Sequence, residues 1–300
     1  MQSTERIAEL RAVLAEQRAH GRTIGFVPTM GALHEGHLSL IRRARAGADF
    51  VVVSVFVNPI QFNDTRDLGA YPRDLARDAA LIGDEKGDLL FAPPVGEMYP
   101  SGFQTEVRVL ELSKPLEGAA RGTSHFDGVA TVVAKLFNIV QPSVAYFGQK
   151  DAQQVAVIRR MVRDLSIPVQ IEVCPTVREP DGLAMSSRNV LLDADARKRA
   201  PAIKAALDVA EQLIEDGERD AAAVEQAAKT RLAEAAIVPE YCDVVSAVDL
   251  TPVRTIANDV LIAIAARVGR VRLIDNALVH IAGRASTTSK EADGITIQGR

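Results

Sequence analysis

The sequence predicts an α/β protein in which helices cover both faces of a parallel sheet, followed by a smaller α+β part. Short apolar runs alternate with segments of helical period through the first 188 residues. These runs are nearly continuous in apolar character, which is typical of strands buried on both faces. After Asn189 the alternation stops, and Ala-rich, charged segments of helical period precede three further apolar runs. The chain is therefore expected to hold two domains.

The first part contains the alternating elements. We expect helices at residues 4–19, 37–46, 71–86, 126–140 and 153–164. We expect strands at residues 23–28, 49–57, 88–91, 143–147 and 169–174. In a sheet of this kind ligands bind outside the carboxyl ends of the strands. The loops after Pro28, Val57, Phe147 and Cys174 follow strand ends and hold most of the unusual residues, so the site is expected there.

The second part reads as helices and an antiparallel sheet. Residues 193–236 have helical period with a break at Gly217, and strands are expected at 241–245, 260–266 and 271–280. The expected division is 1–188 for the ligand-binding domain and 189–283 for a smaller domain that covers the cleft. Residues 284–300 are polar and unpatterned, which predicts a disordered tail.

Composition narrows the class of protein. With 47% hydrophobic and 25% charged residues and a net charge of −4, the chain of 300 residues has no global basic field for nucleic acid. Its apolar runs are too short for membrane helices, and the charged N-terminus lacks a signal-peptide core. We expect a cytoplasmic protein in which Cys174 and Cys242 are buried thiols.

The segment PTMGALHEGHLSLI, residues 28–41, carries the strongest chemical signal. A strand ends, a loop with Gly31 and Gly36 turns, and a helix begins near His37. Helix N-termini favour phosphate, and glycines allow close approach of a ligand to the backbone. His34 and His37 could then donate to phosphate oxygens. A metal pair is the alternative, although the spacing is one residue short of the zincin H-E-x-x-H and no third ligand cluster is evident.

Two further loops offer phosphate ligands. GQKD, residues 148–151, places Lys150 at a strand end, where it could act as a mobile charge. GLAMSSRN, residues 182–189, supplies Ser186, Ser187 and Arg188, which could close over a triphosphate. The alternatives are a polar turn for the first loop and a surface loop at a domain junction for the second.

The segment VNPIQF, residues 57–62, also follows a strand. Gln61 and Asn58 offer amide groups to the expected cleft. The nearby AYPRDLARD contributes Tyr71 and Asp78. Asp78 could bind Mg²⁺ directly or through water, or it could be a solvent-facing helix carboxylate.

Together these segments resemble the pantothenate synthetase family. The stretch at residues 28–41 closely resembles its signature, and FVNPIQF, YPRD, FGQKD, TVREPDGLAMSSRN and LIDN follow in the family's order, over residues 1–282. The resemblance implies a Rossmann-like fold and a two-step ligase. ATP and pantoate would give pantoyl adenylate and pyrophosphate, and β-alanine would then attack the acyl carbon to give pantothenate and AMP. It implies Mg²⁺ with ATP and no tightly bound organic cofactor.

The resemblance also assigns roles to individual residues. His37 would be the catalytic histidine, with His34, Lys150 and Arg188 acting at the phosphates. The implied ATP-binding residues are Met30, Gly31, Ala32, Leu33, His34, Glu35, Gly36, His37, Gly148, Gln149, Lys150, Asp151, Val177, Met185, Ser186, Ser187 and Arg188. The implied substrate-binding residues are Gln61 for pantoate and β-alanine, Gln154 for pantoate, and Asn58, Tyr71 and Arg121.

The chain departs from the family's pattern at two positions. Gln149 stands where many relatives have Glu, which matters little if the backbone makes the contact. Arg77 stands before Asp78 where some relatives have a second carboxylate, which argues for one protein carboxylate at most on Mg²⁺. Family members are usually homodimers through the N-terminal domain, and the run Val51–Val57 is apolar enough to form such a contact.

Proteins with other functions could carry similar motifs. A nucleotidyltransferase that keeps AMP or CMP on its product would share the H-x-G-H motif, but it would lack the combination of QF and GQKD. A non-catalytic nucleotide-binding module would not require His34, His37, Lys150 and Arg188 together. A tRNA-binding synthetase is disfavoured by the acidity of the chain.

Overall fold

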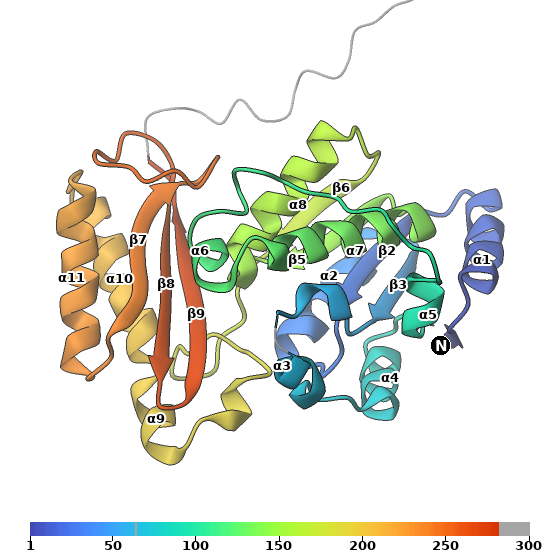
Figure 1. The fold of residues 1–300 in the computed structure, drawn as a ribbon, viewed down its shortest axis with the longest axis horizontal. Helices are drawn as coiled ribbons and strands as arrows, with labels where there is room; N and C mark the ends of the chain where they lie inside the picture. The colour runs from blue at the N-terminus through green and yellow to red at the C-terminus, as the bar shows by residue number, and fades with distance from the viewer. Residues whose placement is uncertain (64, 282–300) are drawn as a thin grey trace, which may run out of the picture.

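The computed structural model describes residues 1–63 and 65–281. The tail expected at 284–300 lies outside the described residues. Figure 1 shows two parts side by side, one built on a six-stranded sheet and one on a three-stranded sheet.

The first sheet is parallel throughout, as predicted. Its strands lie in the order β1-β4-β3-β2-β5-β6, and every neighbouring pair is parallel. The strands are β1 (Gln2–Thr4), β2 (Ile24–Thr29), β3 (Phe50–Val55), β4 (Leu89–Phe91), β5 (Val144–Gly148) and β6 (Gln170–Cys174).

Helices cover both faces of this sheet, which confirms the predicted fold class. Phe26 and Val52 pack with residues of α1 (Ile7–Ala19), α7 (Ser124–Val140) and α8 (Ala152–Asp164). Val27 and Val53 pack with residues of α2 (Glu35–Gly47) and α4 (Leu75–Asp84) on the opposite face. Alternate residues of each strand thus enter different cores, as the period of two requires.

The helix predicted at 71–86 differs from the structure. The chain forms α3 (Thr65–Ala70), and α4 begins only at Leu75. Pro72 disfavours helical backbone at Tyr71, and the Asp74 side chain caps α4 by accepting a hydrogen bond from the backbone N–H of Arg77 at 3.0 Å. Shorter elements lie between the larger ones: α5 (Val95–Met98), α6 (Glu117–Arg121) and the 3₁₀ turns η1 (Pro59–Gln61), η2 (Gln149–Asp151) and η3 (Asn189–Leu191).

The second part is the expected helical and antiparallel assembly. Strands β7 (Pro239–Ser246), β8 (Val260–Val268) and β9 (Val271–Val279) pair antiparallel in that order. Helices α9 (Ala194–Arg199), α10 (Ala202–Glu215) and α11 (Ala221–Glu234) precede them, and Gly217 follows α10 with a φ of 104°. One face of the sheet packs on α10 and α11 (Figure 1). The other face turns Leu261 and Ala263 towards the core of the first part.

The boundary at residue 188 stays an interpretation. Leu183, five residues earlier, already packs in the core of the second part. The loop after β6 therefore starts from the sheet of the first part and packs against the core of the second part.

Residues 51–53 of the apolar run Val51–Val57 are fully buried in β3, a central strand with β4 on one side and β2 on the other, so these three residues offer no dimer surface. Among the described residues, no helix combines the length and apolar character needed to cross a bilayer.

Candidate active site

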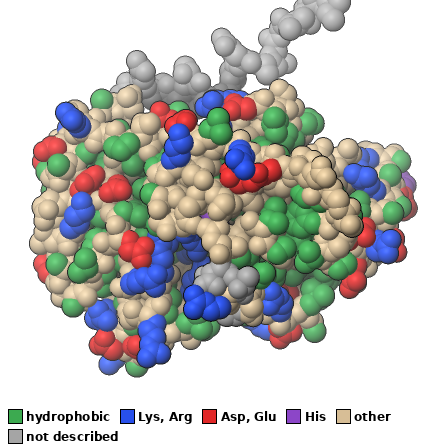
Figure 2. Space-filling model, in the orientation of Figure 1, with side chains coloured by type: hydrophobic (Ala, Val, Ile, Leu, Met, Phe, Trp, Pro, Cys, Tyr) green, Lys and Arg blue, Asp and Glu red, His purple; other side chains and the backbone are tan. Residues whose placement is uncertain are grey.

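The strand order reverses between β2 and β5, and the candidate site lies at this point. From β2 the chain adds β3 and β4 on one side of the sheet, and later β5 and β6 on the other. A cavity of about 420 Å³ opens there, lined by residues that follow β2, β3, β5 and β6. The four loops that the sequence placed at strand ends thus meet around one cavity. Figure 2 shows Lys and Arg side chains gathered in a hollow where the two parts of the molecule meet.

Most of the predicted site residues line this cavity. They are Met30, His34, Gly36, His37, Asn58, Gln61, Tyr71, Arg121, Gly148, Lys150, Asp151, Gln154, Val177, Met185, Ser186, Ser187 and Arg188. The others are not part of its lining. Gly31, Ala32 and Leu33 form the turn under the histidines, Glu35 pairs with Arg42, and Gln149 contacts the C-terminal sheet.

His34 and His37 are placed by the start of α2. His34 is the N-cap, and its Nδ1 accepts a hydrogen bond from the backbone N–H of Gly36 at 3.1 Å. His37, three residues later, accepts at its own Nδ1 from the backbone N–H of His34 at 3.4 Å. The pair forms a capping box in which imidazoles take the usual places of Ser and Glu. A Cβ on Gly36 would lie 2.8 Å from Cε1 of His34, so the site needs glycine there.

These contacts fix the tautomer of each ring. A backbone N–H can only donate, so both Nδ1 atoms must be unprotonated acceptors. Each neutral ring therefore carries its proton on Nε2, the nitrogen left for a ligand. Burial lowers the pKa of His37 to about 3, and a proton on the adjacent His34 ring or the charge of Lys150 disfavours a positive His37 further. Burial likewise lowers the pKa of His34, with a further contribution from Lys150. The pair thus offers two neutral N–H donors at a helix N-terminus.

Asp78 supports the turn from below. It is 1% exposed, and its two oxygens accept hydrogen bonds from the backbone N–H groups of Ala32 and Leu33, both at 2.8 Å. Ala32 has a φ of 52°, a left-handed conformation that costs a non-glycine residue roughly 1–2 kcal/mol. Asp78 stabilises this strained turn. The structure thus gives Asp78 a bracing contact, and neither cavity beside the nucleotide loops includes it.

Gln61 is oriented by a chain of buried amides and hydroxyls. Asn58, 1% exposed, donates from Nδ2 to Oε1 of Gln61 at 3.0 Å and to the carbonyl of Gly128 at 3.1 Å. The Tyr99 hydroxyl donates to Oδ1 of Asn58 at 2.8 Å. Because Oε1 of Gln61 is held, its NH₂ group turns towards Met30 and the cavity. Asn58 thus positions Gln61, and Tyr99 was not predicted from sequence.

Arg121 and His125 form another part of the wall. His125, which the sequence reasoning did not select, donates from Nδ1 to the carbonyl of Gln61 at 2.8 Å. Its Nε2 is then left to accept from Nη1 of Arg121 at 3.2 Å. Nε of Arg121 also lies 3.4 Å from Oε2 of Glu117. The scarcity of histidine, five in the chain, was the one signal that could have pointed to His125.

The remaining cations come from two loops. Lys150 lies in the turn after β5, and no carboxylate of the described chain forms an ion pair with it. Arg188 is exposed at the end of the loop from β6. Beside Val177, the Thr176 hydroxyl is buried at the cavity and lacks a hydrogen-bond partner within the described residues. Such a group is available to a polar ligand. No cluster of three or more metal-ligating side chains occurs in the described segments.

Comparison of this chain with known proteins identifies its family. The sequence model described as pantoate-beta-alanine ligase matches residues 2–278. This chain belongs to the pantoate–β-alanine ligase family. A pantothenate synthetase of Heliobacterium modesticaldum is 54% identical, over 94% of this chain and 100% of the relative. The family therefore covers nearly the whole chain, as the ordered motifs predicted.

Solved structures of the family share the fold. The crystal structure of pantothenate synthetase from Thermus thermophilus superposes with a TM-score of 0.87 at 48% identity, covering 92% of this chain and 99% of that one. A pantoate-beta-alanine ligase from Francisella tularensis, described as complexed with β,γ ATP and β-alanine, gives 0.75 at 35% identity, covering 93% and 97%. Both agree with a Rossmann-like first part followed by a smaller second part.

Proposed function

We propose that this chain condenses pantoate with β-alanine at the expense of ATP, through pantoyl adenylate. The observation that carries the proposal is the pair of neutral Nε2–H donors, His34 and His37, at the start of α2 in a cavity that Lys150 also lines. This arrangement suits a polyphosphate. Family membership supports the ligase over a nucleotidyltransferase that keeps its nucleotide and over a binding module.

In the first step a carboxylate oxygen of pantoate attacks the α-phosphorus of ATP. The bond from the α-phosphorus to the bridging oxygen breaks, and pyrophosphate leaves. His34, His37 and Lys150 donate to the phosphate oxygens, on which charge grows, and Ser186, Ser187 and Arg188 hold the departing pyrophosphate. We assign Val177 and the free Thr176 hydroxyl to the adenosine side of the cavity.

Pantoate would lie between two amides. Gln61 presents its NH₂ group because Asn58 holds its oxygen, and Gln154 lines the same cavity. Tyr71 and Arg121 would complete the pantoate-binding end of the cavity. In the second step the β-alanine amine attacks the acyl carbon, the bond from that carbon to the AMP oxygen breaks, and the amine loses a proton. A closed cavity between the two parts would protect the adenylate from water.

Mg²⁺ would enter with ATP, held mainly by the phosphates. We favour a bracing role for Asp78 over direct metal contact, because its oxygens already accept from Ala32 and Leu33. A resident organic cofactor is not part of the proposal.

A homodimer and a cytoplasmic location remain proposals. The proposed dimer forms through the N-terminal domain, and light scattering of the purified chain tests whether the chain is a dimer. Both cysteines are free and buried, as a reducing compartment would allow.

The test is a product analysis. The purified chain is incubated with ATP, Mg²⁺, pantoate and β-alanine, and the products are followed by ³¹P NMR and mass spectrometry. Pantothenate and AMP are expected in equal amounts, and His37→Ala should abolish both. A stable product that retains the nucleotide would contradict the ligase assignment.

A further inference from the structure

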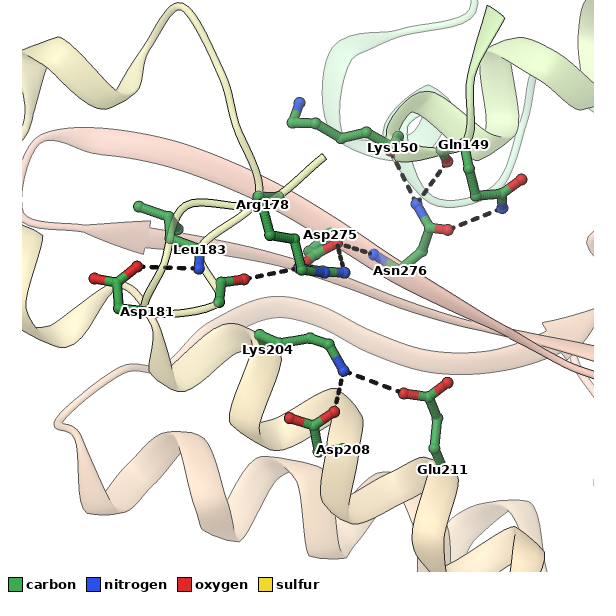
Figure 3. A network of polar contacts seen from close by, with 12 residues as sticks. Gln149, Lys150, Arg178, Asp181, Leu183, Lys204, Asp208, Glu211, Asp275 and Asn276 are labelled. Atoms are coloured by element: carbon green, nitrogen blue, oxygen red, sulfur yellow. Dashed lines mark hydrogen bonds and ion pairs between the residues drawn. The ribbon is translucent and has the colours of Figure 1, made fainter. Parts of the chain in front are cut away.

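Two polar residues of β9, Asp275 and Asn276, are buried in the second part of the molecule. They are 4% and 6% exposed. Buried polar side chains need hydrogen-bond partners. Apart from one bond to the adjacent backbone, every partner of this pair lies in the loops after β5 and β6, which belong to the candidate nucleotide site (Figure 3).

Asn276 holds the backbone that carries Lys150. Its Nδ2 donates to the carbonyls of Gln149 at 3.0 Å and Lys150 at 2.9 Å. Its Oδ1 accepts from Nε2 of Gln149 at 3.0 Å. Both donors of the amide are used, and they fix two consecutive carbonyls of the short turn η2. In Figure 3 the Lys150 side chain extends away from this contact, which leaves its ammonium available to the cavity.

Asp275 holds the loop that leads to Met185–Arg188. Its carboxylate accepts from Nη1 of Arg178 at 2.6 Å and from Nη2 at 3.1 Å. Nη1 of Arg178 also donates to the carbonyl of Gly182 at 3.0 Å. Residues 177 to 185 close on themselves, since Arg178 bridges to Ala184 and Met185 donates to the carbonyl of Val177 at 2.9 Å. Asp275 thus anchors a narrow hairpin whose end is the Ser–Ser–Arg segment.

The register of the second sheet explains why one strand reaches both loops. Asn276 pairs with Ala263, which faces the core of the first part, and Asp275 pairs with Ile264, which faces α10 and α11. Successive side chains of a strand point to opposite faces. Asn276 therefore meets η2, while Asp275 meets the hairpin on the side where Leu183 packs.

We propose that Asp275 and Asn276 are positioning residues for the adenylation step, which hold the Lys150 turn and the 185–188 segment in register with each other. The second part then completes the nucleotide site in addition to covering it. This inference rests on the proposed function. It assigns no contact with substrate to either residue, and so predicts an effect on ATP use that exceeds the effect on β-alanine.

The test compares Asn276→Asp, Asn276→Ala and Asp275→Asn with Val279→Ala in the intact chain. Asn276→Asp keeps the shape but points an acceptor at two carbonyls. Val279 lies in the core of the second part, at the C-terminal end of β9 and three residues beyond Asn276, and is 8% exposed. It controls for loss of stability without contact to either loop. The readouts are the melting temperature, the rate of the pyrophosphate burst without β-alanine, and the KM values for ATP and β-alanine.

For Asn276→Asp and Asp275→Asn we expect the burst rate to fall about 10- to 100-fold and the KM for ATP to rise, because small displacements of catalytic groups have effects of this size. The KM for β-alanine should change little, and Asn276→Ala should be milder than Asn276→Asp. Val279→Ala should keep the burst rate at a comparable melting temperature. Burst rates that follow melting temperature across all four variants would overturn the inference. A wild-type chain that makes no pantothenate would instead overturn the proposed function.

Discussion

His34 and His37 show how one spacing serves both the fold and the site. A separation of three residues places them at the N-cap and N3 positions of α2, where each Nδ1 satisfies a backbone N–H that the helix leaves unpaired. The same bonds force the proton of each ring onto Nε2. The ligand-facing donors are therefore set by the helix start itself.

The pH dependence of this pair follows from its lowered pKa values. The folded pKa of His37, about 3, lies below the unfolded value near 6.5. The unfolded chain thus binds more protons between these values, and the contribution of neutral His37 to stability is complete above pH 6.5 and lost as pH falls towards 3. ¹⁵N NMR of labelled histidine should show His37 as the neutral Nε2–H tautomer at pH 6, and His34 should titrate with a pKa below its ordinary value. A positively charged His37 ring at that pH would contradict this.

At the scale of a structural element, Asp78 braces the turn that leads from β2 into α2. Asp78→Asn removes one acceptor and turns an NH₂ group towards a backbone N–H, which should cost about 1–3 kcal/mol of stability. The strained turn at Ala32 should loosen and the KM for ATP should rise. Denaturant unfolding and ATP kinetics measure both effects.

Magnesium titration distinguishes this role of Asp78 from metal binding. Bracing predicts that the concentration of free Mg²⁺ needed for half-maximal activity stays near the wild-type value in Asp78→Asn. A large rise in that concentration, with unfolding unchanged, would instead identify Asp78 as a metal ligand.

Close packing between α7 and η1 places Gln61. A Cβ on Gly128 would lie 2.6 Å from the carbonyl oxygen of Ile60 and 2.7 Å from Cα of Gln61, so Gly128→Ala must displace this backbone. We expect the KM for pantoate to rise at least about tenfold, because Gln61 moves with the turn. Gly83→Ala in α4 is the control, since its Cβ meets nothing within 4 Å. Unchanged pantoate kinetics in Gly128→Ala would show that Gln61 does not bind pantoate.

The large elements could be predicted because their signals are local. Continuous apolar runs identify β2 to β6, and the helical period identifies α7 and α8. Strand β1 could not be predicted: Gln2–Thr4 is polar, and it forms only by pairing with β4 far along the chain. The start of α4 was misplaced because apolar period outweighed the effect of Pro72.

The site was predictable in part for the same reason. Glycines, histidines and Lys150 stand out at strand ends. The residues that support these site residues do not stand out in the sequence. Asp78 contacts a loop 46 residues away, and Asn276 contacts one that is 127 residues away. Pairings at such distances depend on the fold, and a single sequence does not encode which polar residue finds which partner.

At the scale of the whole molecule, Glu117 joins the two parts. It is 8% exposed and accepts from Nη1 of Arg272 at 2.8 Å, from Nη2 at 2.7 Å and from the Tyr241 hydroxyl at 2.8 Å. Arg121 of the cavity lies beside it. The contact thus links β7 and β9 to the wall of the site.

Acid should weaken this contact. Burial raises the pKa of Glu117, but the hydrogen bonds and charge of Arg272 outweigh it and hold the pKa below its ordinary value. Because the folded pKa is lowered, the contribution to stability is present above pH 4.5 and lost as pH falls through the folded value. Glu117→Gln should cost about 1–3 kcal/mol at pH 7, since it removes the charged acceptor of two Arg272 hydrogen bonds while Glu240 still pairs with Arg272. Equal stability of variant and wild type at pH 7 would contradict this.

We propose that an acyl adenylate forms in the cavity between β2 and β5 before β-alanine takes part. Rapid-quench measurement of pyrophosphate from the purified chain with ATP, Mg²⁺ and pantoate alone tests this order of steps. We expect a burst of about one pyrophosphate per site, followed by pantothenate and AMP when β-alanine is added. Pyrophosphate release that begins only after β-alanine is added would contradict it.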